Sequence, residues 1–89
     1  MQTVTFRQPT SGVLVEGIIV SGYCAKSGTE HFAIAMTDDV KAIDALIADD
    51  LLFDITKDQI IDGLDAVRHE NQMARNLGFE SWLAYERLR

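Results

Sequence analysis

Apolar and polar residues alternate along the first part of the chain, and a period of two is typical of β-strands. Thr3–Arg7 and His31–Thr37 both show this alternation. Between them, Val13–Tyr23 is apolar on both faces, which is the pattern of a central strand. The turn-forming residues of Gln8–Gly12 and Lys26–Glu30 separate the three segments. Because short connections favour antiparallel neighbours, the pattern predicts a three-stranded antiparallel meander.

After Thr37 the apolar residues follow the spacing of helices. A first helix is predicted at residues 38–48, with Thr37 or Asp38 as its N-cap. A last, short helix is predicted at residues 80–88. The run Leu51–Phe53 fits a helical turn, a buried loop or a fourth short strand, since a period cannot be read from so short a run.

The longest helix is predicted at residues 57–77, because signals for both of its ends agree. Thr56 as N-cap and Gln59 three residues later form a capping box. Gly78 stands where a left-handed residue commonly ends a helix. The apolar face of this helix would carry Ile60, Leu64, Val67 and Ala74.

The order of these elements predicts one α+β domain over residues 1–89. We expect a three-stranded antiparallel β-meander followed by three α-helices packed on one face of the sheet. A hydrophobic content of 47% is typical of a globular chain and excludes a disordered one. Trp82 is expected in the core, because so small a domain needs its aromatic residues there.

The net charge of −6 comes from the middle of the chain. Residues 37–65 hold nine aspartates against two lysines, a net charge of −7. On the predicted helix 57–77, the acidic residues and one histidine would form a line opposite the apolar face. We therefore predict a partner-binding surface made of Asp49, Asp50, Asp54, Asp58, Asp62, Asp65 and His69. Such a surface repels nucleic acids and membranes and attracts a basic partner.

The sequence carries no convincing pattern for catalysis or for metal binding. Asp62, Asp65 and His69 are suitable metal-ligand types, but their spacing matches neither a calcium loop nor a zinc motif. Cys24 and His31 flank a predicted hairpin loop, yet no third residue or oxyanion hole accompanies them. We therefore predict neither a metal, nor a cofactor, nor an enzyme.

By elimination, the sequence predicts a small non-enzymatic protein that acts by binding another macromolecule. The partner is expected to be a protein, with this chain as a regulator, an inhibitor or an accessory subunit. A homodimer is compatible with an exposed strand edge, or with Asn71, which interrupts the apolar face of the longest helix. If Asn71 is instead partly solvated, it only marks the end of that face. A single cysteine, the absence of a signal-peptide pattern and the absence of a long apolar run predict a cytoplasmic protein without a membrane anchor.

The alternative hypothesis is a DNA-binding regulator that uses the two C-terminal helices. Ala74, Gly78 and Ala84 resemble the spacing by which a helix-turn-helix motif packs its two helices. The match is degenerate, because Arg87 stands where an apolar residue is expected. A chain of net charge −6 also supplies little of the phosphate neutralisation on which DNA binding depends.

Overall fold

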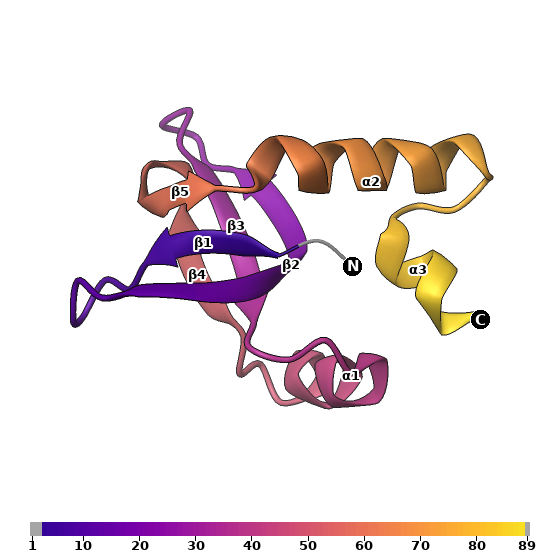
Figure 1. Cartoon of the computed structure of the whole chain (residues 1–89), viewed down its shortest axis with the longest axis horizontal. Helices are drawn as coiled ribbons and strands as arrows, with labels where there is room; N and C mark the ends of the chain where they lie inside the picture. The colour runs from indigo at the N-terminus through magenta and orange to yellow at the C-terminus, as the bar shows by residue number, and fades with distance from the viewer. Residues whose placement is uncertain (1–2, 89) are drawn as a thin grey trace.

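The structure, a computed structural model, describes residues 3–88 and combines a β-barrel with three α-helices (Figure 1). Met1, Gln2 and Arg89 lie outside the described residues. The elements in chain order are β1 (Val4–Arg7), β2 (Leu14–Cys24), β3 (Glu30–Ala35), α1 (Val40–Ala48), β4 (Phe53–Thr56), the 3₁₀ helix η1 (Lys57–Gln59), β5 (Ile60–Asp62), α2 (Leu64–Asn76) and α3 (Trp82–Arg87).

The five strands form one antiparallel sheet in the order β4-β3-β2-β1-β5. In a flat sheet of this order, β4 and β5 would be about 19 Å apart, because neighbouring strands are spaced by about 4.8 Å. Only the three residues of η1 join them, and a 3₁₀ helix rises about 2 Å per residue. The sheet must therefore curl until the end of β4 reaches the start of β5 at η1, and the result is a small, partly open barrel, since β4 and β5 do not pair with each other within residues 3–88.

The long strand β2 serves both halves of this barrel. Its first residues pair with β1 as far as Gly17, and its remainder pairs with β3 from Ile18 onwards. At the change of partner, a Cβ on Gly17 would lie 2.5 Å from the Cγ2 atom of Ile34, so only glycine fits. A bulge between Ile19 and Ser21 bends the strand further.

Two hydrophobic cores lie on opposite sides of the sheet. The barrel core is filled from the strands and closed by Val67 of α2, with Leu64 packed against it. The helical core packs Trp82 and Leu83 of α3 against the outer side of β2 and β3, where Ile18 and Ala35 lie. Figure 1 shows α3 between the far end of α2 and α1, so that the three helices enclose this second core. Trp82 is buried, as the sequence predicted.

The predicted fold class is confirmed in its outline and corrected in its detail. The chain is α+β with an antiparallel sheet and three helices, but the sheet has five strands rather than three. The helices also do not share one face, since α2 closes the barrel while α3 packs outside it. The ambiguous run Leu51–Phe53 leads into β4, which pairs with β3.

The predicted helix at 57–77 is wrong in its first third. The side chain of Gln59 does accept a hydrogen bond from the backbone N–H of Thr56 at 2.8 Å. This capping box, however, begins only the short 3₁₀ helix η1 and not a long α-helix. Residues 60–62 then pair with β1 as β5. Gly63 follows with φ +94°, a conformation that no helix interior contains, and α2 starts only at Leu64. Ile60 is thus a strand residue.

Both longer helices end in the same way. Gly78 adopts the predicted left-handed conformation, and Phe79 N–H bonds to the carbonyl of Ala74 at 3.0 Å. At the end of α1 the left-handed residue is Asp50, and Leu51 N–H bonds to the carbonyl of Leu46 at 2.9 Å.

The N-cap of α1 is Asp39, and not Thr37 or Asp38 as predicted. Its carboxylate accepts a hydrogen bond from the backbone N–H of Lys41.

Asn71 is half-buried, and its amide oxygen accepts a hydrogen bond from the backbone N–H of Trp82 at 3.1 Å. This bond ties the middle of α2 to the first turn of α3. The polar residue in the apolar face therefore sets the position of one helix against the next within the same chain.

Replacing Asn71 by leucine is expected to destabilise the domain by about 1–3 kcal/mol, because the N–H of the buried Trp82 loses its acceptor. Asn71→Asp keeps an acceptor at this position and should retain most of the stability. Gln72→Leu, on the exposed side of the same turn, should stay within about 0.5 kcal/mol. Chemical denaturation of the three variants measures these differences, and equal losses for Asn71→Leu and Gln72→Leu would contradict the role of the bond.

Candidate functional site

Four of the predicted binding residues lie around η1 and the segments beside it, and we call this region the acidic end. Asp54 is on β4, Asp58 on η1, Asp62 on β5 and Asp65 in the first turn of α2. All four are exposed. The reversal of the chain at η1 brings these elements together, and a shallow hollow beside β5 is lined by both Asp62 and Asp65.

The other three predicted residues do not belong to the acidic end. Asp49 and Asp50 follow α1, which Figure 1 shows on the other side of the barrel from β5. His69 is exposed on α2, one turn beyond Asp65. The predicted line of acidic residues along one helix is thus wrong, because Asp58 and Asp62 lie on η1 and β5 rather than on α2.

The carboxylates of the acidic end are largely uncompensated. The side-chain carboxylates of Asp58, Asp62 and Asp65 make no hydrogen bond or ion pair with any residue that the structure describes. The nearby Lys57 is directed to Glu30, with 3.8 Å between its Nζ atom and the carboxylate. Asp54 is the exception, since its Oδ1 atom lies 3.2 Å from Nδ1 of His31. A local excess of negative charge therefore faces solvent at this end.

Cys24 and His31 do not form the thiol–imidazole pair that nucleophilic catalysis requires. In the β2–β3 ladder, Cys24 pairs with Glu30 and Tyr23 pairs with His31, so the thiol and the imidazole point to opposite faces. The His31 ring stacks on Tyr23 with 5.0 Å between centroids. Among residues 3–88, no group of three or more His, Cys, Asp or Glu side chains is placed to hold a metal ion.

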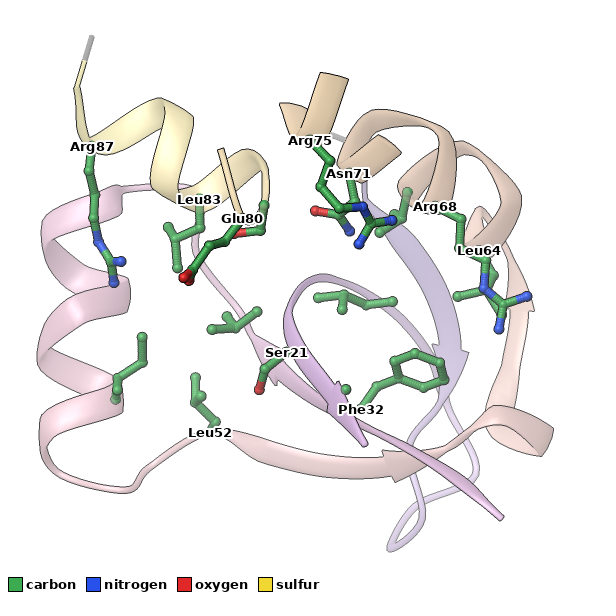
Figure 2. A pocket seen from close by; sticks show the side chains of 16 residues that line it. Ser21, Phe32, Leu52, Leu64, Arg68, Asn71, Arg75, Glu80, Leu83 and Arg87 are labelled. Carbon is green, nitrogen blue, oxygen red and sulfur yellow. The ribbon is translucent and has the colours of Figure 1, made fainter. Parts of the chain in front are cut away.

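A cavity of about 530 Å³ lies between the barrel and the helices, and nothing in the sequence pattern predicted it (Figure 2). Its apolar lining comes from the barrel, from all three helices, and from Leu52 before β4. Its charged lining consists of Arg68, Arg75, Arg87 and Glu80. The lining as a whole runs from Ile19 to Arg87 in the sequence, so no local motif marks it.

Two of the cavity's arginines are held by carboxylates outside the lining. Arg68 donates to Glu30 at 2.9 Å, which joins α2 to the start of β3. Arg87 donates through Nε to Asp44 at 3.2 Å, which joins α3 to α1. The hydrogen bond to Asp44 raises the pKa of Arg87, so the guanidinium stays charged. Arg75 alone of the three has no partner among the described side chains.

The C-terminal helices form the compact corner that the spacing of Ala74, Gly78 and Ala84 suggested. Ala74 is buried and Gly78 makes the turn, but α3 has only six residues. Trp82 and Leu83 face the helical core. Most of α3 therefore serves packing, and DNA binding by the two C-terminal helices stays a prediction from the sequence.

Comparison of the chain with protein-family models, with curated proteins and with solved structures finds no significant match. Within residues 3–88, every helix is too short or too polar to cross a lipid bilayer. The functional argument therefore rests on the geometry and the charges described above.

Proposed function

We propose that this chain is a non-enzymatic binding protein whose acidic end docks a protein with a basic surface. In this role it would act as a regulator, an inhibitor or an accessory subunit of that partner. The observation that carries the proposal is the set of three exposed carboxylates, Asp58, Asp62 and Asp65, that have no partner within the described chain.

Unpaired surface carboxylates favour a basic partner in two ways. They raise the rate of encounter through long-range attraction, and they penalise acidic competitors. The barrel supports the proposal further, because η1 connects two strands whose positions the sheet fixes. The carboxylates of Asp58 and Asp62 are thus carried on a rigid scaffold rather than on a long loop, which lowers the entropy lost on binding.

Nucleic acids are disfavoured as partners, because phosphate groups would meet the same negative charge. A homodimer and a cytoplasmic location both remain predictions from the sequence. Since the amide oxygen of Asn71 already accepts a hydrogen bond from Trp82 within the chain, we favour the strand edges β4 and β5 as the surface for a homodimer.

The test is affinity capture with the full chain from its native host, followed by measurement of the affinity for the identified partner. Neutralising Asp62 and Asp65 to asparagine is expected to weaken binding at least about tenfold, because charge pairs within a protein interface couple by about 1.5 kcal/mol or more. The affinity should also fall with rising salt.

The matched control neutralises Asp38 and Asp49 to asparagine; these exposed residues flank α1, which Figure 1 shows on the other side of the barrel from β5. This pair removes the same charge from the chain, so it should leave the affinity unchanged if the acidic end is the interface. If both pairs of substitutions weaken the affinity equally, the effect comes from the net charge of the chain and not from the acidic end. If neither pair weakens the affinity, the interface lies elsewhere.

A further inference from the structure

The side of α2 that borders the cavity carries hydrogen-bond donors that the described chain leaves unused. Arg68, Asn71 and Arg75 follow one another at spacings of three and four residues, so they share one face of the helix. Figure 2 shows Asn71 and Arg75 side by side at the cavity. The oxygen of Asn71 is held by Trp82 N–H, which leaves its NH₂ group as a donor. Arg75 has no acceptor within residues 3–88.

Apolar side chains line much of the rest of the cavity, together with Ser21 and Ser81. Its volume of about 530 Å³ lies within the range of about 300–1,000 Å³ that small-molecule sites occupy. The lining belongs to both hydrophobic cores and includes Ile19, Phe32, Val67, Leu52 and Leu83. An apolar molecule placed there would gain from the removal of water at this surface.

One guanidinium of the lining has no carboxylate partner among the described residues and is available to an anion. Three arginines and one carboxylate, Glu80, line a cavity in a chain whose net charge is −6. Arg68 and Arg87 are already neutralised by Glu30 and Asp44, so Arg75 is the cation left to receive a ligand. Guanidinium and amide N–H groups together suit the oxygens of a carboxylate or a phosphate.

We propose that this cavity binds a small amphipathic oxyanion, a molecule with an apolar body and a carboxylate or phosphate group at one end. The oxyanion accepts hydrogen bonds from Arg75 and from the NH₂ group of Asn71. The apolar body covers the side chains between the barrel and α3. The cavity does not include the residues of the acidic end, so this proposal does not depend on the proposed protein partner.

The probes are nonanoate and octyl phosphate, titrated into the full chain and followed by calorimetry and by amide NMR shifts of the cavity residues. The two probes have the same octyl tail, so the probe that binds more tightly identifies the preferred head group. Octanol and octyltrimethylammonium should bind at least about tenfold more weakly, because they lack the charge-assisted hydrogen bonds. Acetate and inorganic phosphate should also bind more weakly, because they lack the apolar body.

Arg75→Gln is expected to weaken the binding of the preferred probe about tenfold while the domain stays folded, since this side chain is exposed and unpaired. Lys26→Gln makes the same change of charge on the β2–β3 loop and should have no effect. Glu80→Gln removes the carboxylate from the lining and should tighten binding. Three results would each overturn the proposal: no shift with any probe, equal affinity for octyltrimethylammonium, or equal effects of Arg75→Gln and Lys26→Gln.

Discussion

Replacing Gly63 by alanine is expected to lower the stability of the domain by at least about 3 kcal/mol. The left-handed conformation, with φ +94°, disfavours any side chain by about 1–2 kcal/mol. In addition, a Cβ at this position would lie 2.4 Å from the carbonyl oxygen of Thr3, a backbone atom that cannot turn away. Relief of this overlap must move β5 or the start of α2, and an overpacked site typically loses a further 1–3 kcal/mol or so.

Gly78→Ala is the matched control for this prediction. Gly78 has φ +95°, but a Cβ there would meet no atom within 4 Å. This variant should therefore lose only the conformational contribution of about 1–2 kcal/mol. Thermal unfolding distinguishes the two, since each kcal/mol corresponds to roughly 4–8 °C in a domain of this size. Equal melting temperatures for the two variants would show that Gly63 is not pressed against β1.

Truncating Phe6 to alanine is expected to destabilise the domain by about 3–5 kcal/mol, the usual loss for a buried aromatic ring. Phe6 is 1% exposed and packs in the barrel core with residues of β2, β3, β4 and α2. Its removal leaves a cavity at the point where Gly17 lets β2 change partner, so the barrel cannot close over the gap. Total stabilities of small domains are about 5–15 kcal/mol, so the variant should be close to unfolding at raised temperature.

Phe53→Ala provides the same truncation at an exposed position. Phe53 begins β4 and is 46% exposed, so the expected loss is below about 1 kcal/mol. Urea unfolding of both variants measures the difference directly. A loss at Phe6 no larger than that at Phe53 would contradict the placement of Phe6 in the barrel core.

The sequence predicted the elements that local rules control. The alternation in β1 and β3 arises from the two-residue period of a strand, which each segment carries by itself. The apolar run in β2 was recognisable because a central strand is covered on both faces. The end of α2 at Gly78 was also predictable, because a left-handed glycine ends a helix through hydrogen bonds to its own last turn.

The prediction of one helix at residues 57–77 failed because its capping box is real but controls only one short turn. The capping box at Thr56 and Gln59 starts a helix, yet it says nothing of the length of that helix. Pairing with β1 takes residues 60–62 into the sheet, and Gly63 then allows a new start at Leu64. The glycine within the predicted helix was the available warning.

The sequence by itself determined that the chain is an α+β domain and that its negative charge is concentrated in the middle. It also indicated which residues carry that charge, since composition and period are properties of neighbouring residues. Only the tertiary structure decided that the sheet curls at η1, that its two sides bury separate cores, and that Arg75 and Asn71 border a cavity with apolar side chains in its lining. These features depend on contacts between residues far apart in the chain, which no local pattern encodes.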